Sequence, residues 1–195
     1  MSQKTSQIRE TVKFVFFALI IYLIGFIFGF INFSIDLANP EDRTVIKGEI
    51  KNEVSFFKIL TQNLKVIMTT LSGGLLFGSM SIIALFLNGF VNGVVLESCL
   101  STTNPSNALK LLIPHGIFEI PAIIIAGAAG LKIPYEIIRY LAGKKEQILT
   151  KEDVKEYLTL ALISIILIVI AAWIEANVTL KTAKAMLNST TWEKS

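Results

Sequence analysis

The only histidine of the chain stands four residues before an acidic side chain, inside an apolar segment. His115 and Glu119 belong to the run Pro114-His115-Gly116-Ile117-Phe118-Glu119-Ile120-Pro121-Ala122. On an α-helix this spacing places both side chains on one face. Such a pair can relay protons, supply two ligands to a metal ion, or fix the contact between two helices. We favour the architectural role and expect no metal and no cofactor, because no third ligand is identifiable.

Small residues continue the face that carries this pair. Ala122, Ala126 and Gly130 follow at helical spacing. Small side chains of this kind let helices approach closely inside a membrane. The ionisable pair is therefore expected to sit at the start of a helix-packing seam.

A second group of polar and small residues lies further upstream. Asn88 and Asn92 fall near one face of a helix, and their carboxamides can form interhelical hydrogen bonds worth about 1 kcal/mol each, or can line a polar path. We favour the hydrogen bonds. Three small-xxx-small patterns predict close helix contacts: Gly25 with Gly29, Gly74 with Gly78, and Gly89 with Gly93.

The composition indicates the environment in which these residues lie. Of 195 residues, 53% are hydrophobic and 17% charged, and the mean hydropathy is +0.64, which is typical of a protein embedded in a lipid bilayer. A formal net charge of +3 without a basic stripe argues against nucleic-acid binding. A single cysteine, Cys99, cannot form an internal disulfide.

The apolar runs predict an all-α, polytopic integral membrane bundle that forms one domain over residues 1–195. Residues 36–55 are expected to form an extramembrane connection and residues 132–156 a charged loop, with helix kinks at Pro114 and Pro121. Five membrane helices are expected, at residues 12–35, 56–71, 75–96, 111–131 and 158–174.

Orientation depends on the second of these segments. Residues 56–71 are amphipathic, so they either cross as a short span or lie in the membrane interface. The basic residues of 132–156 and of the N-terminus are expected to face the cytoplasm. Five crossings then place the C-terminus outside, and four place it inside; we favour five.

Enzymatic activity has no positive signal in the sequence. We find no Ser-His-Asp order with believable geometry, no P-loop and no G-x-S-x-G elbow, and therefore expect a protein that is not an enzyme. Glu97 and Glu175 end their helices, and Glu175 is expected to need a partner such as Lys181 or Asn177.

The two motifs together resemble the stage II sporulation protein M family. The resemblance rests on residues 88–93, the Pro114–Ala122 run and the small-residue stretch 126–130, and it covers most of the chain. It implies a five-span plasma-membrane protein that, in spore-forming bacteria, acts with partner proteins in a cell-wall-remodelling complex during engulfment. Relatives also occur in organisms that form no spores, so the resemblance does not carry a sporulation role. It further predicts that His115, Glu119, Asn88 and Asn92 form one polar cluster.

Two functions follow as hypotheses. The first is a non-enzymatic scaffold or subunit of a membrane complex, with other membrane proteins or a second copy of the chain as partners. The second is a small transporter or channel component that uses the His115/Glu119 cluster to handle protons or ions. An intramembrane hydrolase ranks last, because no nucleophile and base can be named.

Overall fold

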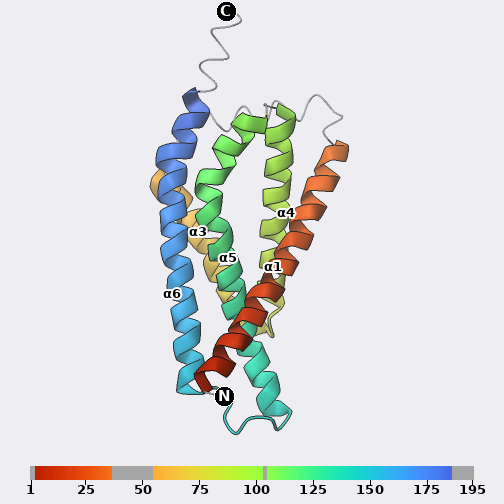
Figure 1. Cartoon of the computed structure of the whole chain (residues 1–195), viewed down its shortest axis with the longest axis vertical. Helices are drawn as coiled ribbons and strands as arrows, with labels where there is room; N and C mark the ends of the chain where they lie inside the picture. Colours follow the sequence, from red (N-terminus) through yellow and green to blue (C-terminus); the bar gives the residue numbers. More distant parts are fainter. Residues whose placement is uncertain (1–2, 37–54, 103–104, 186–195) are drawn as a thin grey trace, which may run out of the picture.

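The computed structural model describes residues 3–36, 55–102 and 105–185, and these residues are helical apart from short turns. The all-α prediction is confirmed for this part of the chain. A short 3₁₀-helix, η1, joins α3 to α4, and a π-helix, η2, continues α6 (Figure 1). The elements are α1 (Gln3–Asp36), α3 (Phe56–Leu71), η1 (Ser72–Leu76), α4 (Ser79–Thr102), α5 (Pro105–Leu141), α6 (Lys151–Ile174) and η2 (Glu175–Thr179).

Four helical stretches are long and apolar enough to cross a membrane. They are Ile8–Asn32, Ser79–Ser101, Pro105–Leu141 and Lys151–Ala185. Large apolar side chains cover their outer faces, where water would be an unfavourable neighbour and lipid a good one. Examples with about half of the side chain exposed are Phe16, Ile24, Phe28, Ile83, Leu87, Leu162 and Ile166. The described helices therefore expose an apolar belt of the kind that membrane proteins present to lipid.

The prediction of five membrane helices is wrong, because residues 56–71 do not form a candidate span. Helix α3 has 16 residues and so is about 24 Å long, shorter than the roughly 30 Å hydrocarbon layer. Lys58 and Lys65 are both exposed on it. Ile59, Ile67 and Leu71 are buried, so α3 is a short amphipathic helix packed against α4, α5 and α6.

Helix α3 nevertheless runs back along the bundle, so that the long helices before and after it in the sequence, α1 and α4, are parallel. Gly25 of α1 faces Phe86 of α4, and four residues later Gly29 faces Phe90, so α1 and α4 run in the same direction. Helices α1, α4 and α6 consequently point one way and α3 and α5 the other, which places the start of α1 and the end of α6 at opposite ends of the bundle (Figure 1).

The predicted start of the third span also differs from the structure. The third span does not begin at residue 75, because η1 ends at Leu76 and α4 starts only at Ser79. Gly78 has a φ of +86°, a left-handed conformation that suits glycine and ends the helical turn. Gly74 and Gly78 therefore do not share one helix, but both lie against α5, where an added Cβ would come within 3.2 Å of Ile133 and Leu131, respectively.

The expected charged loop 132–156 is mostly helical. Helix α5 continues to Leu141, and α6 begins at Lys151, which leaves residues 142–150 as the connection. A capping box explains the early start of α6: the Thr150 side chain accepts from the Asp153 backbone N–H, and the Asp153 carboxylate accepts from Thr150. Helix α5 remains one helix through Pro114, Pro121 and Pro134.

The tightest helix contact joins α1 to α4. A Cβ added at Gly25 would overlap the carbonyl oxygen of Phe86, and one added at Gly89 would overlap that of Tyr22. The contact therefore brings backbone against backbone, as small-xxx-small seams do in membranes. Four glycines share this geometry: Gly25, Gly29, Gly89 and Gly93.

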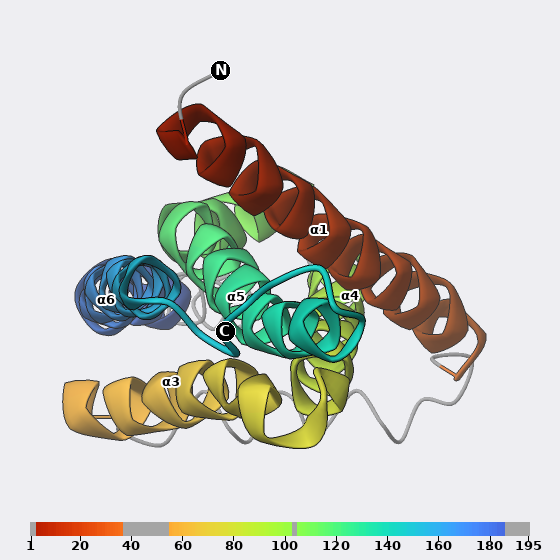
Figure 2. The ribbon, with the colours of Figure 1, turned by 90° about the horizontal axis from the view of Figure 1, so that it is seen from below.

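Helix α5 lies at the centre of the bundle, with the other helices around it (Figure 2). Its small-residue face is fully enclosed: Ala122, Ala126 and Gly130 are all buried. At Gly130 an added Cβ would collide with the Ser81 hydroxyl and the Thr70 carbonyl oxygen. The position of α5 places its His115/Glu119 face against η2.

Candidate functional site

The His115/Glu119 pair lies on α5, next to the π-helix η2. His115 Nδ1 and Thr179 Oγ1 are 3.2 Å apart, a hydrogen bond whose direction depends on the tautomer of the imidazole. His115 Nε2 lies 3.9 Å from Glu119 Oε2, which is longer than a hydrogen bond. The imidazole is therefore held by a neighbouring helix, and Glu119 lies beside it.

The π-helix brings a second carboxyl group to this place. In η2 the Leu180 N–H donates to the Glu175 carbonyl, five residues earlier, so the local turn is widened; such turns occur often at functional sites. Glu175 lies within electrostatic range of Glu119. Asn63 of α3 approaches the Glu175 carboxyl, although its amide nitrogen has no hydrogen bond of good geometry among the described residues.

A neutral pair from α1 and α4 completes the cluster. Asn92 Nδ2 donates to Tyr22 Oη at 2.8 Å, and Tyr22, only 2% exposed, lies within electrostatic range of Glu119. Asn88 instead donates to the Ala84 carbonyl of its own helix at 2.7 Å. We call the set from α1, α3, α4, α5 and η2 the intramembrane polar cluster: Tyr22, Asn63, Asn92, His115, Glu119, Glu175 and Thr179.

The structure thus joins some of the predicted site residues and adds others. His115, Glu119 and, through Tyr22, Asn92 lie in one cluster, whereas Asn88 forms its hydrogen bond elsewhere. Asn177 bonds to the Trp173 carbonyl at 3.0 Å and so is not the partner of Glu175. Tyr22, Asn63 and Thr179 gave no spacing signal, because each comes from a different helix.

A second group of charged residues lies at the end of the bundle where α5 passes into α6. The Lys132 ammonium pairs with the Glu156 carboxylate, to which the Thr11 hydroxyl also donates. Lys132 and Glu136 are 3% and 2% exposed, so their charges need partners. We call this set the basal charge network: Glu10, Thr11, Lys132, Glu136, Arg139, Lys145, Asp153 and Glu156.

Lys145 ties the connecting loop to both helices of this hairpin. Its ammonium donates to Glu136 Oε2 at 2.7 Å and also to the Asp153 carboxylate. Burial by itself lowers the pKa of Lys145, but the hydrogen bonds to Asp153 and Glu136 outweigh it and raise the pKa above its usual 10.5. Arg139 extends the network to α1, with Nη1 3.6 Å from Glu10 Oε2. The network therefore fastens α1, α5, the loop and α6 together.

The family of the chain follows from a match that covers most of its length. Residues 18–180, from within α1 to just beyond η2, match the profile of the stage II sporulation protein M family. The chain belongs to this family. The resemblance drawn from the motifs is thereby confirmed, and the matched range includes the complete intramembrane polar cluster.

Two relatives of this family member come from the archaeon Methanocaldococcus jannaschii. One uncharacterized protein is 46% identical over 170 residues, which cover 87% of this chain and 95% of the relative. A second uncharacterized protein is 33% identical over 102 residues, covering 50% of this chain and 47% of the relative. No solved structure matches the chain.

Proposed function

We propose that this protein is a non-catalytic subunit, or scaffold, of a plasma-membrane complex, with its N-terminus in the cytoplasm and membrane proteins as partners. The observation that supports it best is how the polar side chains at membrane depth are used. Asn92 binds Tyr22, His115 binds Thr179, and the Ser81 hydroxyl donates to the Thr70 carbonyl at 2.6 Å. Each of these bonds joins two different helical elements.

Such bonds suit a protein whose task is to keep one shape. In lipid, a polar group without a partner is costly, so an interhelical hydrogen bond both satisfies the group and fixes the helix register. The interlocked α1–α4 backbone contact works in the same direction. A rigid bundle that exposes apolar faces offers neighbouring membrane helices a constant surface.

The stability of the purified protein tests this use of the cluster. His115→Ala removes the bond to Thr179, and Glu119→Ala empties the space beside it, so both variants are expected to lower the melting temperature by several degrees. They should also reduce the fraction recovered in the assembly that the parent forms in native membranes. Glu146→Ala, at an exposed loop position, is the matched control.

The size of the native assembly tests the scaffold role itself. After mild solubilisation of native membranes, the parent should migrate well above its own 21.5 kDa, after allowance for bound detergent. A parent that migrates as a single chain, even after crosslinking in the membrane, would show the scaffold proposal to be wrong. If the two alanine variants melt and assemble like the parent, the pair has no architectural role.

One observation favours a second candidate, the handling of protons or ions. Glu119 of α5 and Glu175 of η2 lie within electrostatic range of each other, and within the described residues the only basic side chain at ion-pair distance from either is His115. Carboxyl groups at membrane depth commonly mark proton or ion pathways. The described residues contain no group of three or more His, Cys, Asp and Glu side chains suited to a metal ion, so we place protons first.

Flux measurements separate the two candidates. In proteoliposomes with a pH gradient, a pathway predicts proton flux that Glu119→Gln abolishes and that Glu97→Gln, a matched carboxyl change on α4, leaves intact. A scaffold predicts no flux above that of empty vesicles under gradients of protons, sodium or potassium. Flux unaffected by Glu119→Gln would show that the cluster is not the pathway.

A further inference from the structure

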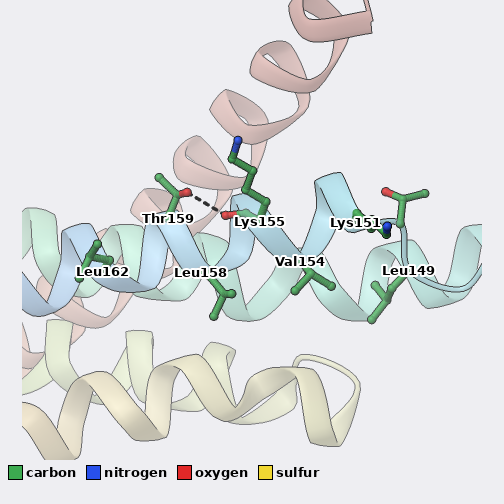
Figure 3. A pocket seen from close by; sticks show the side chains of 8 residues that line it. Leu149, Lys151, Val154, Lys155, Leu158, Thr159 and Leu162 are labelled. Atoms are coloured by element: carbon green, nitrogen blue, oxygen red, sulfur yellow. Dashed lines mark hydrogen bonds between the residues drawn. The ribbon is translucent and has the colours of Figure 1, made fainter.

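An open groove runs along the outer face of α6 at its N-terminal end. Its volume is about 550 Å³, and it is remote from the intramembrane polar cluster. Figure 3 shows Leu149, Val154 and Leu158 along one edge and Lys155 and Thr159 along the other. The complete lining is Leu149, Thr150, Lys151, Val154, Lys155, Leu158, Thr159 and Leu162.

The two lysines of the groove differ from the three basic residues of the basal charge network. Lys132, Arg139 and Lys145 each meet a carboxylate in the basal charge network. Lys151 and Lys155 are exposed, and neither has an ion-pair partner in the part of the chain that the structure describes. Four residues apart, they lie on neighbouring turns of one helix face. The groove therefore carries two lysines that make no ion pair with the described residues.

The groove also lies at the start of a candidate membrane span. The candidate span that contains α6 begins at Lys151, and the groove continues one turn at a time through Val154, Leu158 and Leu162. Lysines at such a level extend toward the headgroups while their stems cover apolar surface. The first turn of α6, capped by Thr150, adds the positive end of the helix dipole.

From this arrangement we propose that the groove binds an anionic phospholipid of the surrounding bilayer. The phosphate accepts hydrogen bonds from the ammonium groups of Lys151 and Lys155, and one acyl chain lies along Val154, Leu158 and Leu162. A zwitterionic lipid has the same acyl chains but no net charge to complement the two lysines. The site is thus selective for headgroup charge, and it is independent of whether the protein is a scaffold or a pathway.

Spin-labelled lipids measure this selectivity directly. The full chain is reconstituted in phosphatidylcholine vesicles that carry a trace of acyl-labelled phosphatidylglycerol or phosphatidylcholine, and the motionally restricted fraction of each is compared. A lysine near the membrane surface is expected to contribute roughly a fivefold preference for the anionic lipid. Lys151→Gln/Lys155→Gln should therefore bring the two lipids to nearly equal binding.

Two further variants separate the groove from general surface charge. Lys181→Gln/Lys184→Gln makes the same charge change at the other end of the same helical stretch and should keep the preference. Val154→Trp fills the groove without changing charge and should lower binding of labelled phosphatidylglycerol, whereas Ile170→Trp, on an exposed position of α6, should not. An unchanged preference in Lys151→Gln/Lys155→Gln, or an equal loss in Lys181→Gln/Lys184→Gln, would overturn the proposal.

Discussion

The basal charge network and the intramembrane polar cluster satisfy buried polar groups in different ways. In the network, cations and carboxylates alternate, and Lys132, 3% exposed, meets Glu156 directly. In the cluster, neutral groups do most of the bonding: Asn92 binds Tyr22 and His115 approaches Thr179. Two carboxyl groups, Glu119 and Glu175, have no lysine or arginine beside them among the described residues.

The difference is what we expect if the network lies near the lipid headgroups and the cluster deeper in the bilayer. Near the headgroups a buried ion pair keeps access to water at its rim, so alternating charges can fasten helix ends at moderate cost. Deeper in hydrocarbon an isolated charge is very costly, so neutral hydrogen-bonding partners take over. The network is therefore expected to be sensitive to the loss of one charge, and the cluster to the loss of one hydrogen bond.

Removal of the Lys132 charge should cause the largest loss of folding stability. Lys132→Met leaves the part-buried Glu156 without its cation, and breaking a buried pair in this way typically costs about 3–5 kcal/mol. Lys132→Met/Glu156→Met removes both charges and should recover much of that loss. Unfolding of the detergent-solubilised protein by a denaturant series measures both variants.

The control for this comparison is another lysine at the same end of the bundle. Lys144→Met changes an exposed side chain and should be within about 0.5 kcal/mol of the parent. If Lys132→Met alone is as stable as Lys144→Met, or if the double variant is worse than the single one, Lys132 and Glu156 do not depend on each other for stability.

The hydrogen bond between Asn92 and Tyr22 should contribute less to folding stability. In a double-mutant cycle of Asn92→Val and Tyr22→Phe, the coupling free energy should be about 0.6–1.7 kcal/mol, the range of hydrogen bonds between membrane helices. The same cycle with Asn88→Val should show no coupling to Tyr22→Phe, because Asn88 donates to Ala84 within α4. A coupling above 3 kcal/mol would instead place this neutral bond on a level with the ion pairs of the network.

The sequence carried the information for the fold and for part of the cluster. Apolar runs and small-xxx-small spacing are periodic signals within one segment, and they point to the helices and to the glycines of the α1–α4 contact. The His115–Glu119 spacing is also local. Tyr22, Asn63 and Thr179 join the cluster only through tertiary packing, so no periodicity in the sequence singles them out.

The basal charge network was missed for a related reason. The sequence predicts one loop over residues 132–156, because charges in a membrane protein normally indicate contact with water. Lys132 and Glu136 are instead buried in α5, where Glu156 of α6 pairs with Lys132, and Arg139 and Lys145 pair with Glu136. Helix α3 shows the converse limit: its amphipathic pattern predicts the helix correctly, but its 16 residues are too few for the predicted fifth span.

Alkaline pH should weaken the basal charge network, and the resulting loss of stability should be the smallest of these effects. Hydrogen bonds to Asp153 and Glu136 raise the pKa of Lys145 in the folded protein above its usual 10.5. The stabilisation from these bonds is therefore complete below pH 10.5 and is lost as the pH rises through the higher folded-state value. Part-exposed pairs of this kind contribute about 1 kcal/mol or less.

The measurement is the difference in unfolding free energy between the parent and Lys145→Met at pH 9 and again above pH 11. The difference should shrink at the higher pH, because deprotonation removes from the parent what the substitution has already removed from the variant. Lys145→Arg keeps its charge in this range and should lose less stability than the parent, and Lys144→Met should follow the parent at both values. A difference between parent and Lys145→Met that stays constant would mean that lost packing, and not the ammonium charge, explains the cost of removing Lys145.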